Sequence, residues 1–216
     1  WVAKGRGLDE AYKAFIMTTC ALVYSTVMLG HWAWLKDWAN INSLPQFAAY
    51  AAMFLSANLL ILPGLYFVAV WIGQRLAGAP ATGKSEPAAK SPTPPTLKKL
   101  WIDVAYALVP MGLIGWIAFS LSFIFVNGSY AIPLISDPFG WGWNLLGTAD
   151  FHWTPIIPDL VRFIQAPLLL GGLALSILTA YRILHQHFEA SRAFRGVIPV
   201  AVFLTAITSV FMFLYL

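Results

Sequence analysis

Charge is scarce in this sequence. Only 10% of its 216 residues are Asp, Glu, Lys or Arg, whereas 59% are hydrophobic. A soluble globular domain carries about 25% charged residues. The shortage excludes an ordinary soluble domain and indicates a membrane protein. The formal net charge of +4 is then no signal for nucleic-acid binding, because in a membrane protein the placement of basic residues matters more than their sum.

Cysteine is almost absent as well. The single cysteine, Cys20, lies inside an apolar run. It excludes a disulfide within the chain and any cysteine-ligated metal cluster built from this chain alone. A signal-peptide pattern is also missing from Trp1 to Gly7, because no apolar stretch precedes a cleavage site there. Since the first residue is not Met, two interpretations stay open, a missing start or the tail of a longer polypeptide.

Long apolar runs are what the sequence does have. A membrane-spanning helix needs about 20 largely apolar residues, and five segments qualify. They run from about Ala11 to Leu35, Phe47 to Ile72, Leu100 to Val126, Leu160 to Leu184 and Val197 to Leu216. Backbone groups in lipid must be hydrogen-bonded within their own segment, so these are expected to be helices. The predicted fold class is an all-α integral membrane protein with about five transmembrane helices.

Basic residues predict the orientation. They precede the first span, fill the connection between the second and third, and flank the turn between the fourth and fifth. Only Lys36 and Arg162 fall on the other side. Because cytoplasmic loops are enriched in Lys and Arg, we expect a cytoplasmic N-terminus and a periplasmic C-terminus in the inner (cytoplasmic) membrane of a bacterium.

The segment between the second and third spans is rich in Pro, Ala and Lys. Such a composition cannot bury a core, so residues 77–98 are predicted to form a flexible cytoplasmic linker. The linker divides the chain into a two-helix membrane segment, residues 1–76, and a three-helix membrane segment, residues 99–216. The second of these contains a Trp-rich loop, residues 127–159, that is predicted to face the periplasm.

Within this loop, the stretch from Ser136 to Asp159 has too many Trp and Pro residues for a helix and contains no Lys or Arg. Its large rings Phe139, Trp141 and Trp143 stand among turn-forming glycines and need a surface to pack on. One interpretation is a docking face for a periplasmic partner. The other is an aromatic belt at the lipid headgroups, which membrane proteins have in any case.

The four histidines restrict where a haem could sit. His31 and His152 are predicted on the outer side, whereas His185 and His187 lie on the inner side, about 30 Å away across the hydrocarbon. Only His31 and His152 can share a haem b, and His31 alone can bond a quinone oxygen. His185 and His187 are interpreted as interfacial polar residues.

Two further polar residues lie at the outer end of the fourth span. Arg162 is either an anchor for a haem propionate or quinone headgroup, or a partner of Asp159 three residues earlier. Gln165 lies beside it and is a further candidate for haem or quinone binding. Mid-membrane, Asn58 precedes the pair Pro63-Gly64, which is expected to distort the second span and free a carbonyl.

The second half of the chain carries a family resemblance. YALVPMGLIGWIAFSL from Tyr106, VNGSY from Val126, SDPFGWGWNLLGTA from Ser136 and LVRFIQAPLLLGGLALSILTAYRI from Leu160 resemble the C-terminal membrane region of bacterial membrane-bound polyferredoxins. This group includes the quinol-linked subunit of periplasmic nitrate reductase and the nitrous oxide reductase regulator. Its members pass electrons between the quinone pool and periplasmic carriers. The resemblance extends loosely from Gly5 to about Ile183.

This chain departs from that family in lacking the CxxCxxCxxxCP motifs that hold its iron–sulfur clusters. Any such clusters would belong to an upstream segment or to a partner subunit, and no ligand residue carries over. The sequence therefore predicts a membrane subunit of a respiratory-type electron-transfer complex, which anchors membrane and periplasmic redox partners, contributes to a quinone site and catalyses nothing alone. The alternatives are a purely structural assembly subunit and a small transporter or membrane enzyme. The lack of a chain of buried acids counts against a proton pump.

Overall fold

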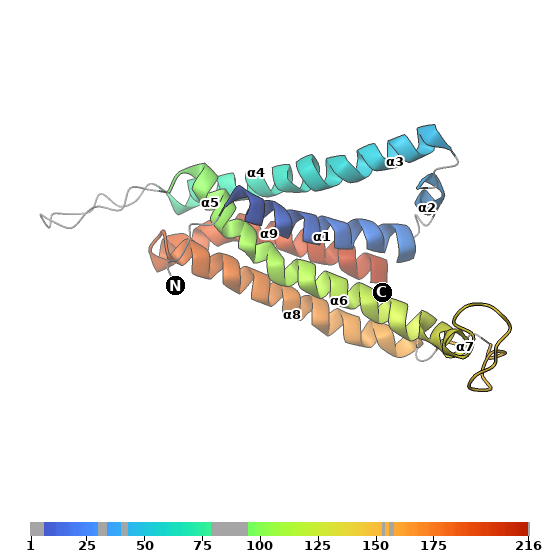
Figure 1. Ribbon diagram of the computed structural model, residues 1–216. Helices are drawn as coiled ribbons and strands as arrows, with labels where there is room; N and C mark the ends of the chain where they lie inside the picture. The colour runs from blue at the N-terminus through green and yellow to red at the C-terminus, as the bar shows by residue number, and fades with distance from the viewer. Residues whose placement is uncertain are drawn as a thin grey trace, which may run out of the picture.

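The computed structural model describes residues 7–29, 34–39, 43–78, 95–152, 154–155 and 158–215, and these residues form helices and loops without a strand (Figure 1). The helical elements are α1 Leu8–Leu29, α2 Leu35–Trp38, α3 Leu44–Ser56, η1 Ala57–Ile61, α4 Leu62–Ala77, α5 Leu97–Val104, η2 Ala105–Ala107, α6 Leu108–Asn127, η3 Gly128–Tyr130, α7 Ala131–Ser136, α8 Pro158–His185 and α9 Ala190–Tyr215.

Five stretches of the described residues are long and apolar enough to cross a membrane, in agreement with the predicted number of spans. They are Leu8–Met28, Leu44–Ala77, Leu97–Ser136, Leu160–His185 and Ala190–Tyr215. The second span joins α3, the π-helical turn η1 and α4, and the third joins α5 through α7. Hydropathy was sufficient to find them because a segment that crosses lipid must be apolar along its length. It must also be helical, since a helix satisfies its own backbone hydrogen bonds.

The third and fifth spans extend furthest beyond their predicted limits, whereas the first was expected to reach Leu35 but its helix α1 ends at Leu29. The third was expected to end near Val126, but helical structure continues through η3 and α7 to Ser136, so the first part of the predicted outer loop is helical. The fifth was expected to begin near Val197 but starts at Ala190. Its extra turns are polar on one side and bury Ala193 and Gly196 on the other, so hydropathy missed them.

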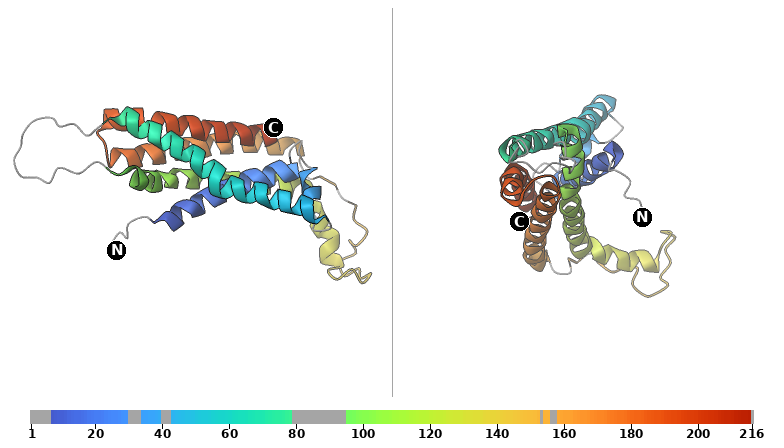
Figure 2. Two further views of the ribbon diagram at one scale, coloured as in Figure 1. Left: turned by 90° about the horizontal axis from the view of Figure 1, so that it is seen from above. Right: turned by 90° about the vertical axis from the view of Figure 1, so that its left-hand side faces the viewer.

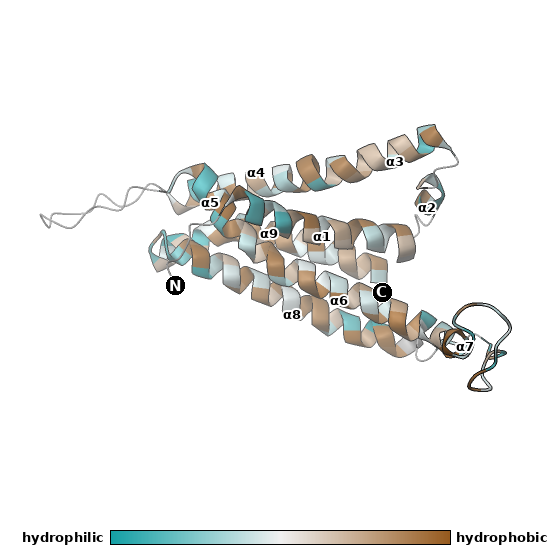
Figure 3. Ribbon diagram, in the orientation of Figure 1, coloured by the Kyte–Doolittle hydropathy of each residue, from teal (hydrophilic) through white to brown (hydrophobic). Residues whose placement is uncertain are grey.

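The spans pack as an antiparallel bundle in which α1 contacts α6, α6 contacts α8, α8 contacts α9 and α9 contacts α4 (Figure 2). At one end, here called the basic end, α1, α5 and α9 begin and α4 and α8 end. At the opposite end, here called the loop end, α8 begins and the loop after α7 projects beyond the bundle (Figure 1). Hydrophilic residues gather towards these two ends (Figure 3). The described basic residues of the basic end are Lys13, Arg75, Lys98, Lys99, Arg182, Arg192 and Arg195.

Helices α4 and α9 approach each other closely at a pair of glycines. A Cβ atom added to Gly73 would lie 2.4 Å from the carbonyl oxygen of Gly196, and one added to Gly196 would lie 3.2 Å from the carbonyl oxygen of Gly73. Small residues at such a crossing let two backbones pack closely, which drives helix association in a medium as apolar as the side chains. This pair of glycines holds α4 against the bundle.

The main core lies near the basic end. The ring of Phe15 stacks on Trp101 at 5.1 Å between centroids and meets the buried Tyr66 edge-on at 5.5 Å. The hydroxyl of Tyr66 donates to the carbonyl oxygen of Val104 at 2.6 Å. That carbonyl belongs to the residue just before the 3-10 turn η2. The bond therefore joins α4 to the start of the third span.

Candidate functional site

One carboxylate organises the first part of the loop after α7. Asp137 accepts hydrogen bonds from the backbone N–H of Trp141 at 2.9 Å and from that of Gly142 at 2.8 Å. Gly140 and Gly142 have φ values of +67° and +79°, a conformation that glycine adopts without steric cost. The sequence Asp-Pro-Phe-Gly-Trp-Gly-Trp thus folds into a tight turn around its own aspartate.

Buried polar groups fix the base of the same loop. Ser136, which is fully buried, donates to the side-chain oxygen of Asn144 at 3.0 Å and accepts from the N–H of Leu146 at 3.2 Å. Asn144 also accepts from the N–H of Ala149. Further along, the hydroxyl of the buried Ser129 accepts from the N–H of Thr154 at 3.2 Å. As expected from its composition, the described part of this stretch before α8 contains no helix, and side-chain hydrogen bonds replace the helical ones.

This scaffold presents three aromatic rings, Phe139, Trp141 and Trp143, which we call the aromatic triad. Phe139 stacks on Trp141 at 5.0 Å, and Trp143 meets both rings edge-on at 5.8 and 5.1 Å. The three side chains are nevertheless 63%, 68% and 40% exposed. The triad is therefore a preformed apolar surface, and its role as a docking face stays a prediction.

The described residues that were considered for haem or quinone binding differ in their exposure. His152 is an exposed loop residue and Arg162 is exposed near the start of α8. His31, Trp32 and Trp153 lie outside the described residues, as does the side chain of Asp159, so the His31–His152 haem site and the Asp159–Arg162 pair stay predictions. The described residues contain no cluster of three or more His, Cys, Asp or Glu side chains that could hold a metal ion.

Gln165 has a different environment from its neighbour Arg162. It is almost completely buried, and its amide donates to the carbonyl oxygen of Ala118 at 2.7 Å and to the hydroxyl of Ser122 at 2.6 Å. These bonds join α8 to α6 near the loop end. Its side-chain oxygen has no protein partner among the described residues. Gln165 thus acts first as a link between helices.

A polar site also interrupts the second span. Asn58 is buried in the π-helical turn η1, immediately before the helix that contains Pro63. Its amide donates to the carbonyl oxygen of Phe54 at 2.8 Å, and the thiol of Cys20 donates to its side-chain oxygen at 3.5 Å. A proline removes a backbone donor, and a π turn is one way for the helix to accommodate this. The sequence predicted the distortion of the second span but not the contact between Asn58 and Cys20 of α1.

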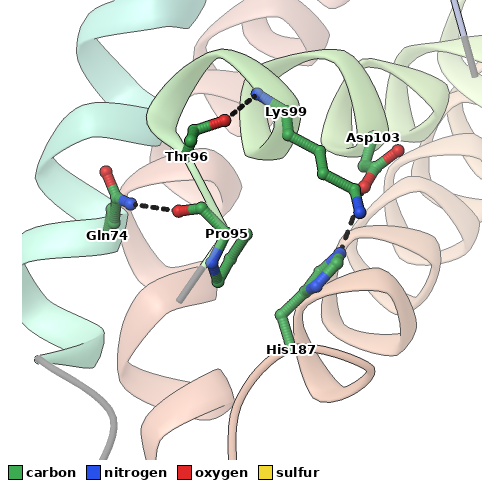
Figure 4. Close-up of polar contacts among 6 residues, drawn as sticks. All are labelled: Gln74, Pro95, Thr96, Lys99, Asp103 and His187. Atoms are coloured by element: carbon green, nitrogen blue, oxygen red, sulfur yellow. Dashed lines mark hydrogen bonds and ion pairs between the residues drawn. The ribbon is translucent and has the colours of Figure 1, made fainter. Parts of the chain in front are cut away.

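At the basic end, polar contacts join elements that are distant in sequence (Figure 4). His187, just after α8, lies 3.1 Å from the carboxylate of Asp103 in α5. The side-chain amide of Gln74 donates to the carbonyl oxygen of Pro95 at 3.0 Å. The end of α4 and the start of α5 are therefore held side by side, which brings together the two ends of the predicted linker. Residues 79–94 lie outside the described part of the chain.

No protein-family model, no curated protein and no solved structure matches the chain.

Proposed function

We propose that this chain is an integral membrane subunit of a respiratory-type electron-transfer complex, in which it anchors redox partners through the aromatic triad. One observation carries the docking part of the proposal. Three large rings are held in place by the backbone scaffold of Asp137, Gly140 and Gly142, and yet they remain exposed. Exposed rings that lose little conformational freedom on binding are well suited to be interface anchors.

The charge around the triad favours a protein partner over the lipid surface. Residues 131–155 contain Asp137 and Asp150 and no Lys or Arg. Anionic headgroups attract Lys and Arg, so this acidic segment gains nothing electrostatically from them. The redox character of the partner rests on the resemblance to the polyferredoxin membrane region. The expected periplasmic position of the triad rests on the basic residues at the opposite end of the bundle.

A structural assembly subunit is the second candidate, and a specific observation favours it. Helix α3 buries no residue against the rest of the described chain. In a complex, a neighbouring helix would cover this face. Optical spectra of the purified complex distinguish the two candidates, because haem or iron–sulfur bands that are stoichiometric with this chain are expected only for an electron-transfer complex.

The orientation is tested by labelling single cysteines in a Cys20→Ala background. With a membrane-impermeant thiol reagent applied to cells whose outer membrane is permeable, we expect Leu145→Cys to react and Ser85→Cys to react only after lysis. The opposite pattern would contradict a cytoplasmic basic end and a periplasmic triad.

Docking is tested by removing two of the three rings. Interface aromatics typically contribute about 2 kcal/mol or more, which is roughly 30-fold in affinity. The double variant Trp141→Ala/Trp143→Ala is therefore expected to release the partner on detergent extraction, as measured by co-purification. Asp137→Ala, which keeps all three rings but removes the two backbone hydrogen bonds, is expected to weaken retention as well.

The matched control is Trp34→Ala/Trp38→Ala. These two rings also lie near the loop end, contact each other at 5.2 Å and are exposed. Retention of the partner in this control but not in the triad variant supports docking through the triad. If both double variants retain the partner at wild-type stoichiometry, or if both lose it, the triad is no specific docking site.

A further inference from the structure

A groove opens at the basic end, where the start of α1 meets α4 and α5. Its volume is about 410 Å³, and it is lined by Leu8, Phe67, Leu97, Lys98 and Trp101. A water molecule takes about 30 Å³ of the liquid, so the groove can hold part of a chain-like molecule. Four of its five lining residues are apolar, which favours a hydrocarbon occupant.

The inner wall of the groove consists of aromatic rings that already pack against one another. Trp101 stacks on Phe15 at 5.1 Å, meets Tyr12 edge-on at 6.1 Å and faces Phe67 at 6.5 Å. Trp101 and Phe15 are buried, whereas Phe67 is partly exposed on the groove side. Rings locked in this way form a rigid surface, so a chain that enters the groove does not have to order it first.

Lys98 is the one charged side chain that lines the groove among the described residues. It lies three residues before Trp101 and therefore on the same face of α5. It is also in the first turn of that helix, where the helix dipole adds positive potential. Lys99 is not part of the lining. The groove thus combines apolar walls with a positive rim.

The charges nearest to this rim have other contacts. Asp9 pairs with Lys13 at 3.6 Å, and Glu10 accepts a hydrogen bond from the hydroxyl of Tyr106. The guanidinium of Arg75 lies over the ring of Trp71 at 5.2 Å from its centroid. Within the described residues, Lys98 itself makes no ion pair with an acid. Its positive charge is therefore available to a ligand.

We propose that this groove binds one anionic phospholipid of the bilayer, with an acyl chain along Leu8, Phe67 and Trp101 and the headgroup phosphate on Lys98. The position suits such a ligand, because the groove lies at the end of the membrane spans where headgroups and acyl chains meet.

The lipid is expected to stabilise the junction of α1, α4 and α5, since it would contact all three. This inference is independent of the docking role of the aromatic triad at the opposite end. A lipid site at the basic end can exist whether or not the triad binds a partner.

The test uses the full chain in a mild detergent with palmitoyl-oleoyl phosphatidylglycerol as the anionic lipid and palmitoyl-oleoyl phosphatidylcholine as the zwitterionic one. Native mass spectrometry counts retained lipids. One phosphatidylglycerol is expected to persist at activation energies that remove phosphatidylcholine. Lys98→Gln is expected to weaken this binding about fivefold, because a Lys near an anionic lipid surface contributes about that factor. Lys99→Gln, which removes the same charge from the neighbouring residue, is the matched control.

A second variant tests the walls without changing the charge. Leu97→Trp fills the groove and is expected to abolish retention of the lipid while size-exclusion and circular-dichroism profiles stay unchanged. A phosphatidylglycerol with a photoreactive acyl chain should label the peptides that contain Phe67 and Trp101. Equal binding of the two lipids, equal losses in Lys98→Gln and Lys99→Gln, or labelling away from these peptides would each overturn the proposal.

Discussion

Helices α3 and α4 are two parts of one predicted membrane span, yet they differ in how many residues they bury against the bundle. Both are largely apolar, and they are joined by the five-residue turn η1. Helix α3 buries none of its residues. Helix α4 buries seven, namely Leu62, Pro63, Tyr66, Ala69, Val70, Gly73 and Ala77. Apolar character alone therefore does not decide which part of a span is packed.

The difference lies in what each helix offers a neighbour. In lipid, an apolar side chain gains little by leaving acyl chains for another helix, so association depends on close approach and hydrogen bonds. Helix α4 has both, through Gly73 against Gly196 and through the hydroxyl of Tyr66. The comparison teaches that small residues and hydrogen-bonding groups decide which part of this span is buried. Matched substitutions at buried and exposed positions of α3 and α4 test this conclusion.

The largest effect is expected for Gly73→Ala. Its new methyl group would lie 2.4 Å from the carbonyl oxygen of Gly196, so α4 and α9 must move apart. Overpacking of this kind costs about 1–3 kcal/mol. Thermal unfolding of the purified protein in detergent measures the loss. The control is Gly64→Ala on the same helix, where no atom lies within 4 Å of the added Cβ.

Gly64→Ala is expected to leave stability unchanged or raise it by about 0.4–1 kcal/mol, because alanine reduces the freedom of the unfolded chain. Similar losses in the two glycine variants would break the comparison, since the helix itself rather than the contact with α9 would then be the sensitive feature.

A smaller effect is expected for Tyr66→Phe. The substitution keeps the ring but removes the 2.6 Å hydrogen bond to the carbonyl of Val104, which corresponds to about 1 kcal/mol. Tyr50→Phe in α3 is the matched control, because the hydroxyl of Tyr50 makes no hydrogen bond within the described residues. Denaturant titration of both variants should show a shift for Tyr66→Phe alone, and equal shifts would count against the assignment.

Asn58 lies at the border between the two helices and sharpens the comparison further. Side-chain hydrogen bonds inside membrane proteins average about 0.6 kcal/mol, so Asn58→Ala should lower the free energy of unfolding by roughly that amount. A double-mutant cycle with Cys20→Ala measures the coupling across the 3.5 Å thiol contact. Complete additivity of the two variants would show that η1 is not held by α1.

The smallest effect is expected from shortening the segment that follows α4. If α9 holds α4 in place, deletion of residues 82–91 should leave membrane insertion and unfolding temperature unchanged, because Gln74 and Pro95 already hold the neighbouring ends together. Membrane fractionation and thermal unfolding measure this. A large loss of folded protein would show that the segment does more than connect.

The sequence was sufficient to predict five candidate membrane spans, because long apolar runs are visible in hydropathy. It was also sufficient to group Phe139, Trp141 and Trp143, since they lie within five positions of one another among turn residues. It could not separate α3 from α4, because burial depends on where α9 crosses. Nor did it predict that His187 contacts Asp103, or that Gln165 bridges to α6, because these contacts join residues far apart in the chain.

The hydrogen bonds of Asp137 have a consequence for how the loop can vary. The turn is held by one carboxylate, two backbone N–H groups and two glycines, and none of these is a side-chain atom of the aromatic triad. Its shape is therefore encoded separately from the chemistry it displays. The side chains at positions 139, 141 and 143 can be substituted together without changing the loop backbone. The binding specificity of the loop can therefore change, by selection or by design, while its fold stays the same.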